Sequence, residues 1–436
     1  MPTMEVLTPE AEWVVTPDVI ESHYSALNLH RKCPQAWFYR YEMGLRSPIV
    51  GPAPHLRYGS WWGVLIGVDA LERGRKHGSL VIPPRKIRPI DGGPEFDQST
   101  VTVVDVLMAA KDWWEKLDPV SQEVSLDKMG ETAPRRLRNA YLRWKDEYAE
   151  DQKNERPLGL EVFWKRSLPV PDTHGLWEDG APAEWGGKPG VALLGYIDQI
   201  YYDTAREMVV CRDDKFLSSL SNQTALDDMM DSQLQLYPWG VDPILKQHGL
   251  PSIKAISYDR VKSVEPSKPQ VTGTGGLSKS VTQYDVRTYR EWAKGPTGEG
   301  VLYGKEGEYW ASGAKKGLPK WGYYTEDPAV VERLSAPQWR HQFNARTLVP
   351  YSRNIARAHL RAAYDTATDI WTTQNRATIA LEAARNLSKD NCRWCDYSAF
   401  CRAQMVGGPE GEYDLREFGL EGRGGELKLV TLRDAA

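Results

Sequence analysis

Two aspartates and one lysine lie near the ends of two neighbouring apolar stretches. Asp198 follows Gly195-Tyr196-Ile197, and Asp213 and Lys215 follow the run Val209-Val210-Cys211. Because side chains alternate along a strand, Asp213 and Lys215 should share one face, and a short turn can bring Asp198 to the same sheet edge. Two carboxylates bind a hard cation such as Mg²⁺ or Mn²⁺, and a lysine stabilises developing negative charge. The set therefore suits phosphodiester hydrolysis, in which the cation acidifies water and neutralises phosphoryl oxygens.

Three further residues extend this set. Glu161 lies on the preceding expected strand and is a further candidate carboxylate. Gln233 and Tyr237 are four residues apart in an expected helix, so both face the same side of it. They can hydrogen-bond the lysine, the water or a DNA backbone. Alone, the D-x-K triplet is common and the helix could be an ordinary amphipathic one, so the signal lies in the combination.

The order of these residues resembles the RecB/AddB branch of the PD-(D/E)XK nucleases, especially its phage-encoded exonucleases. The resemblance implies an α/β fold with a mixed central sheet flanked by helices, plus large helical additions at both ends. It implies that Asp198, Asp213 and the carbonyl of Asp214 are metal ligands, that Lys215 is catalytic, and that Gln233 and Tyr237 position substrate or lysine.

One expected residue is missing from this pattern. The branch usually carries a histidine metal ligand in an early G-x-x-x-H helix, whereas Gly63 ends the matching segment that begins at Gly59. His55 has the literal spacing, but Pro52 and Pro54 make a helix there improbable, and His23 fits neither spacing nor context. Phe216 also stands where threonine is common. The missing imidazole could weaken metal binding, shift metal preference or mark a nuclease that has lost activity.

Four of the five cysteines form a second pattern. Cys392, Cys395 and Cys401 make a C-x₂-C-x₅-C cluster near one end, and Cys33 lies near the other. This arrangement resembles the iron–sulfur nucleases of the same branch, which implies a [4Fe-4S] cluster that holds both ends of the chain together. Four thiolates also satisfy tetrahedral zinc, which remains the alternative. Cys211, within a strand, is expected to be a buried structural thiol.

The expected elements group into five regions. Strands are expected at 158–164, 191–202, 208–212 and 253–261, and helices at 18–45 (two, broken at Pro34), 61–71, 101–117, 134–150, 224–240, 327–336 and 350–386. The regions are 1–155, helical with Cys33; 156–265, the nuclease core; 266–326, an insertion; 327–405, helical with the cysteine cluster; and 406–436, a tail.

Composition limits the setting of the protein. The chain has 436 residues, a formal net charge of -4 and a mean hydropathy of -0.54. No stretch reaches the roughly 20 apolar residues of a membrane span, and the first residues lack the features of a secretory signal. We therefore expect a cytoplasmic protein without a membrane partner, in the host cytoplasm if it is phage-encoded. Residues 250–294 hold eight Lys or Arg against four Asp or Glu, a local excess that can bind phosphates or simply form a solvated surface.

Together these features predict a metal-dependent DNA exonuclease that uses Mg²⁺ or Mn²⁺, acting on single-stranded or duplex ends in phage recombination, replication or repair. A recombination or annealing protein is a possible partner. Two alternatives stay open: a DNA-end-binding protein with a degenerate site, motivated by Gly63, and a nuclease of the CRISPR-adaptation type. Arg340, His341 and Arg346 are candidate phosphate contacts.

Overall fold

A computed structural model gives the three-dimensional structure of the chain. It describes residues 19–45, 54–82, 87–89, 93–117, 133–168, 190–217, 220, 225–263, 269, 271, 277, 285–309, 311, 316, 318–336, 343–374, 385, 388, 392, 395–407, 413–418, 420 and 429–430.

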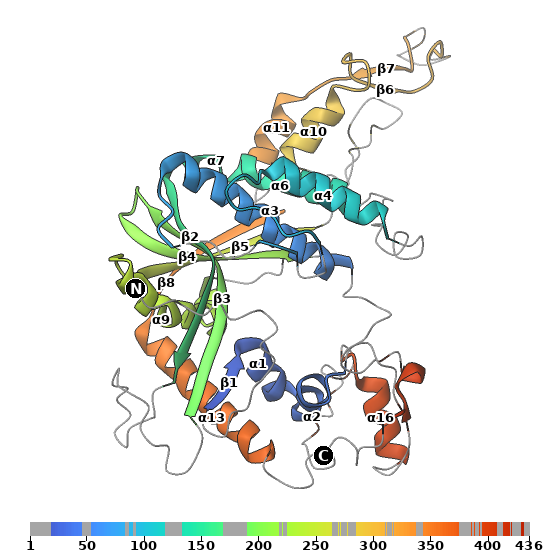
Figure 1. The fold of residues 1–436 in the computed structure, drawn as a ribbon. Helices are drawn as coiled ribbons and strands as arrows, with labels where there is room; N and C mark the ends of the chain where they lie inside the picture. Colours follow the sequence, from blue (N-terminus) through green and yellow to red (C-terminus); the bar gives the residue numbers. More distant parts are fainter. Residues whose placement is uncertain are drawn as a thin grey trace.

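A mixed sheet of six strands forms the centre of the molecule (Figure 1). Its strands are β1 (Val19–His23), β2 (Glu155–Ser167), β3 (Gly190–Asp203), β4 (Met208–Leu217), β5 (Ile253–Lys262) and β8 (Asn344–Pro350). The order is β1-β3-β4-β5-β8, and β2 pairs with β3. Pairing is parallel for β1 with β3 and for β4 with β5, and antiparallel for the other neighbours.

One edge of β3 is shared by two strands with a gap between them. β4 pairs with Gln199 to Asp203, and β1 pairs with Gly190 to Leu194. Residues 195–198 lie between these two ladders, while the other edge of β3 pairs with β2 along nearly its whole length. Beyond Gln199 the register of β4 continues with β5 alone. The sheet therefore forks at Asp198, and the strand ends on either side of the fork frame an opening.

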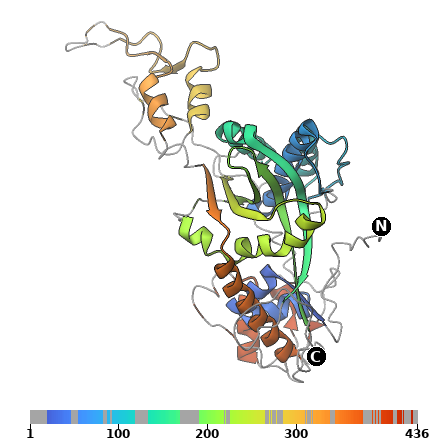
Figure 2. The ribbon, with the colours of Figure 1, turned by 90° about the vertical axis from the view of Figure 1, so that its left-hand side faces the viewer.

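Helices cover both faces of this sheet (Figures 1 and 2). On one face lie α3 (Pro54–His77), α4 (Val103–Glu115), α6 (Ala133–Glu147) and α7 (Ala149–Asn154), and apolar side chains of α3, α4 and α6 form a core with Leu160, Phe216 and Val261. On the other lie α8 (Ala225–Met229), α9 (Ser232–Gln247) and α13 (Arg353–Gln374). The expected α/β class, with a mixed sheet flanked by helices, is confirmed.

The first described helices and the C-terminal elements lie together below the sheet in Figure 1. There α1 (Tyr24–Lys32), α2 (Pro34–Trp37) and the π-helix η1 (Phe38–Glu42) pack near α16 (Ser398–Gly407), followed by β9 (Tyr413–Asp414), the 3₁₀ helix η2 (Leu415–Phe418) and β10 (Leu429–Val430). The Tyr397 hydroxyl donates a hydrogen bond to the Leu45 carbonyl at 3.0 Å. Arg31 Nε donates to Thr366 Oγ1 at 2.8 Å, which ties α1 to α13.

An arm projects from the sheet between β5 and β8 (Figures 1 and 2). It contains α10 (Val286–Ala293), the hairpin β6 (Val301–Tyr303) and β7 (Gly322–Tyr324), and α11 (Pro328–Ser335). Tyr289, Ala293, Val330 and Leu334 form its own small core. The arm falls within the residues expected as an insertion and the start of the next helical region, and that domain division remains a prediction.

Several expected elements were wrong or incomplete. β1 occupies residues expected to be helical, and β8 occupies the gap before the expected 350–386 helix, whose described part ends at Gln374. Both strands depend on partners far away in sequence, Gly190 to Leu194 and Ala255 to Val261, which local propensity does not report. Helix α3 starts at Pro54, so His55 is helical after all, because proline is favoured at a helix start. In the described residues, no helix is both long and apolar enough to cross a membrane.

Candidate active site

A pocket of about 640 Å³ opens at the fork in the sheet. All six residues expected to act in catalysis line this pocket, and so does Asp214. The six are Glu161, Asp198, Asp213, Lys215, Gln233 and Tyr237. They come from β2, β3, β4 and α9, so a span of almost 80 residues is brought to one place. Their spatial convergence agrees with the sequence interpretation, while their individual roles remain proposals.

At the fork, the Asp198 side chain makes a hydrogen bond in place of a backbone hydrogen bond between β3 and β4. Its Oδ2 accepts a hydrogen bond from the backbone N–H of Asp214 at 2.8 Å, where β3 no longer pairs with β4. Burial, and next the charge of Asp213, raise the pKa of Asp198 to about 7, against the opposing effects of Lys215 and the Asp214 N–H. Two acids in one poorly solvated pocket repel each other when both are ionised, and a bound cation would relieve that repulsion.

Asp213 is held from two sides. Lys215 Nζ lies 2.6 Å from its Oδ2, and the Tyr237 hydroxyl donates to its Oδ1 at 3.1 Å. Gln233 Nε2 donates to the Tyr237 oxygen, and the four-residue spacing predicted that the two residues share one side of the helix but not this bond. Burial alone would lower the pKa of Lys215, but the charges of Asp213 and Asp198 raise it above its usual value. The Lys215 amine is therefore protonated beside these two carboxylates.

Glu161 has an unusual backbone conformation for its place in a strand. Its φ is +46°, in the left-handed region that non-glycine residues rarely adopt. The register places it between Leu160, opposite Gln199, and Val162, opposite Ile197, so it stands across from Asp198. Strained backbone of this kind clusters at functional sites. This signal was not visible in the sequence.

Gly63 and His23, which were considered in place of the histidine that the branch usually carries, also line the pocket. Gly63 lies on α3, and a Cβ built at this position meets no atom within 4 Å. His23 ends β1, and its Nδ1 accepts a hydrogen bond from the Ala26 N–H at 3.3 Å. Burial and the charge of Arg40 lower the pKa of His23. The sequence did not predict that His23 lies in the pocket, because its position follows from the parallel pairing of β1 with β3.

The opposite face of β4 carries a buried ion network. Arg212, which is 0% exposed, pairs with Glu155 and lies 3.5 Å from Asp259, and Arg346 contacts both acids at 3.1 and 2.5 Å. The guanidinium of Arg346 also lies 3.8 Å from the Tyr148 ring centroid. The interpretation of Arg346 as a phosphate contact was therefore wrong, because its charge is committed to Asp259 and Glu155. Arg340 and His341 lie outside the described residues.

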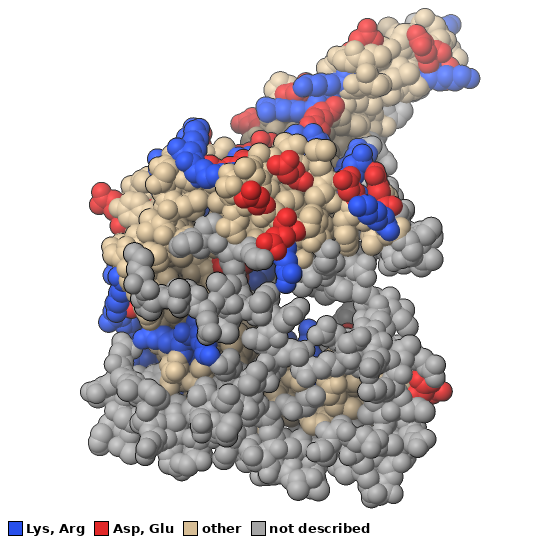
Figure 3. Space-filling view, viewed as in Figure 1, with Lys and Arg blue, Asp and Glu red and all other residues tan. Residues whose placement is uncertain are grey.

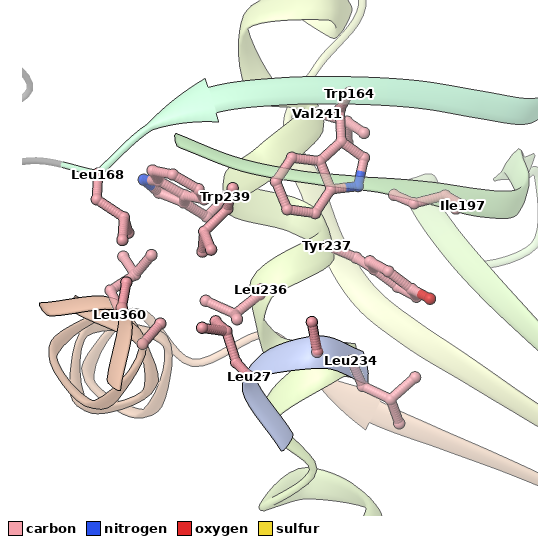
Figure 4. Packing of buried hydrophobic residues seen from close by; sticks show 14 of the residues in the cluster. Leu27, Trp164, Leu168, Ile197, Leu234, Leu236, Tyr237, Trp239, Val241 and Leu360 are labelled. Atoms are coloured by element: carbon pink, nitrogen blue, oxygen red, sulfur yellow. The ribbon is translucent and has the colours of Figure 1, made fainter. Parts of the chain in front are cut away.

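Apolar packing holds α9 against the sheet beside the pocket (Figure 4). Trp164 and Trp239 meet edge to face at 6.1 Å, with Leu236 and Leu360 nearby. The Tyr237 ring belongs to this cluster, and its hydroxyl oxygen points out of it. The cluster thereby fixes the position of the hydroxyl that donates to Asp213.

The four cysteines of the second pattern line one small cavity of about 40 Å³. Burial raises the pKa of the Cys395 thiol, and the nearby sulfurs of Cys33 and Cys401 add to the effect. In the part of the chain that the structure describes, no group of three or more His, Cys, Asp or Glu residues is arranged to hold a metal ion. Cys211 is 0% exposed and lies apart from the four in the sheet core, as predicted.

Comparison with known proteins identifies the family. The model of the PD-(D/E)XK nuclease superfamily matches residues 23–402, so the chain belongs to this superfamily. No curated protein matches the sequence. Among solved structures, one described as "Crystal structure of SSO0001" is similar at 12% identity and a TM-score of 0.22, covering 77% of this chain and 95% of that one.

Proposed function

We propose that the protein is a metal-dependent DNA exonuclease of the RecB/AddB-like branch, acting on DNA ends in phage recombination, replication or repair. The observation that carries this proposal is the convergence of Asp198, Asp213 and Lys215 at one fork in the sheet. Membership of the nuclease superfamily supports the reaction class. The branch and the exonuclease mode rest on the order of motifs in the sequence.

The residues at the fork fit a divalent ion. Asp198 and Asp213 would hold Mg²⁺ or Mn²⁺ through carboxylate oxygens, with the carbonyl of Asp214 as a further ligand. When bound, the ion acidifies water and neutralises charge on the phosphate. Burial, and next the charge of Asp213, raise the pKa of Asp198, and such an ion would offset both effects.

The chain's own groups would then position the reactants. Protonated Lys215 places a positive charge beside Asp213, where it can stabilise a phosphoryl oxygen or orient the attacking water. Gln233 and Tyr237 hold the Asp213 carboxylate from the other side. Glu161, across from Asp198, adds a carboxylate that can accept a hydrogen bond from water. Gly59 and Gly63 leave the α3 wall of the pocket open to a DNA strand.

A nuclease assay with Mn²⁺ on labelled single-stranded and duplex ends tests this proposal. Wild-type protein should release nucleotides from an end, and Lys215→Ala should be slower by at least about 100-fold, the usual cost of removing one charge-stabilising donor. Lys246→Ala is the matched control, since Lys246 pairs with Asp242 at an exposed site. Equal inertness of wild type and Lys215→Ala would favour a DNA-end-binding protein with a degenerate site, the candidate that Gly63 supports.

We also propose that Cys33, Cys392, Cys395 and Cys401 hold a [4Fe-4S] cluster. All four cysteines line one cavity and come from distant parts of the sequence, which supports this assignment, although the described residues contain no group already arranged to hold a metal ion. Such a cluster would cross-link segments more than 350 residues apart and so remove unfolded-state entropy. Anaerobically purified protein should be brown, and Cys33→Ser should lose colour and iron together. Colourless protein with stoichiometric zinc would reject the cluster in favour of a zinc site.

A further inference from the structure

The outer end of the arm is a hairpin that is anchored on one side to α10 and α11. On the inner side, the hydroxyl groups of Tyr324 and Tyr289 lie 2.9 Å apart, and Tyr324 packs against Trp292 at 5.4 Å. The backbone N–H of Asp327 donates to the Tyr289 hydroxyl at 2.8 Å. These contacts join the hairpin to α10 and α11 and present its other side to solvent.

The hairpin exposes large apolar groups. Leu302 and Tyr323 are directly opposed across β6 and β7, and they are 46% and 44% exposed. Toward the tip, Tyr309 bridges to Pro319, and Tyr309 and Leu318 are each 55% exposed. Among the described residues, ten large hydrophobic side chains are exposed, and four of them lie on this hairpin. A monomeric surface rarely gathers such groups without a binding partner.

Charge and composition favour a nucleic acid as that partner. Residues 301–324 contain six aromatic residues, and four lysines against two glutamates, in a chain whose net charge is -4. In the space-filling view, blue Lys and Arg side chains lie on the arm together with red Asp and Glu side chains (Figure 3). Unpaired bases stack on aromatic rings while lysines neutralise the phosphates, whereas a duplex hides the faces of its bases.

We propose that the β6–β7 hairpin binds single-stranded DNA through Tyr309 and Tyr323, separately from the pocket. This inference rests on the proposed function, because the hairpin would give the nuclease a second contact with the DNA strand that is bound at the pocket. In the sequence, the arm lies between β5 and β8, which pair with each other, and β5 also pairs with β4. A strand held on the arm would therefore be tethered to the body that carries Asp213 and Lys215.

Fluorescence anisotropy in EDTA tests the hairpin without relying on catalysis. The Lys215→Ala protein would be titrated onto a labelled oligothymidine of about 30 nucleotides, long enough to span several base-stacking sites. Adding Tyr309→Ala and Tyr323→Ala should weaken binding by about tenfold or more, given the usual contribution of each stacked base. Duplex of the same length should compete poorly. Met108→Ala on α4, also an exposed apolar position, is the control and should change nothing.

The outcomes separate this inference from the nuclease proposal. Weaker binding with unchanged thermal unfolding supports the hairpin site, even if wild-type protein proves to be catalytically inert. Unchanged affinity in the double variant, or an equal loss in Met108→Ala, overturns it. Light scattering that shows a wild-type dimer dispersed by the same two substitutions would assign the surface to a second copy of the chain and also overturn it.

Discussion

The Asp198 carboxylate accepts a hydrogen bond from the backbone N–H of Asp214 at 2.8 Å. A side chain thereby occupies a place where a strand would normally pair. The gap in the edge of β3 exists because β1 and β4 pair with different parts of it. The same gap brings Asp198 beside Asp213 and opens the pocket. The catalytic geometry proposed above is thus a consequence of sheet topology.

Tyr237→Phe should reduce nuclease activity by roughly tenfold. The change removes the hydroxyl that donates to Asp213, and a hydrogen bond to a charged group contributes about 1.5–3 kcal/mol. Steady-state rates in Mn²⁺ measure the effect. Tyr148→Phe is a matched control, since its buried hydroxyl has no hydrogen-bond partner in the described part of the structure. Activity that is the same in both variants would remove Tyr237 from the site.

Gly63→His should tighten Mn²⁺ binding. A side chain at this position starts in open space within the pocket, and imidazole is a good ligand for transition metals. Replacing a glycine inside a helix should also leave stability unchanged or slightly higher. Isothermal titration gives the affinity, with Gly63→Leu as a control of similar bulk. If both variants bind Mn²⁺ alike, Gly63 does not face the metal.

Metal-free protein should lose stability as the pH rises through about 7. The pKa of Asp198 is raised from 3.8 to about 7, so between these values the folded state binds a proton that the unfolded state releases. The contribution of this proton to the free energy of unfolding is fully present below about pH 4 and is lost above about pH 7. Thermal unfolding in EDTA between pH 5 and 8 measures it. Asp198→Asn should flatten the profile; an identical slope in that variant would locate the titrating group elsewhere.

Arg212→Ala should destabilise the protein by about 3–5 kcal/mol, because it leaves Glu155 and Asp259 buried without one of their partners. Denaturant unfolding provides the free energy. Lys153→Ala, which removes an exposed ion pair with Glu150, should cost less than about 1 kcal/mol. Similar losses in the two variants would mean that the network on the back of β4 does not support the sheet.

The sequence predicted those parts of the molecule that depend on local pattern. Stretches rich in Val, Ile, Tyr and Leu identified β2 to β5, and helical spacing placed Gln233 and Tyr237 on one side of α9. β1 and β8 were missed because their stability comes from distant partners. The position of His23 in the pocket, the left-handed backbone of Glu161 and the internal partners of Arg346 were missed for the same reason. Each depends on the register between strands, which no single segment encodes.

Binding of Mn²⁺ tests the central claim most directly. Titration of metal-free protein, followed by the paramagnetic signal of unbound Mn²⁺, counts the sites and measures their affinity. The wild-type protein should take up Mn²⁺ at the fork, and Asp213→Asn should lose that uptake while its folding, followed by circular dichroism, stays intact. Wild-type stoichiometry and affinity in Asp213→Asn would show that the two aspartates do not share an ion, and would contradict the account.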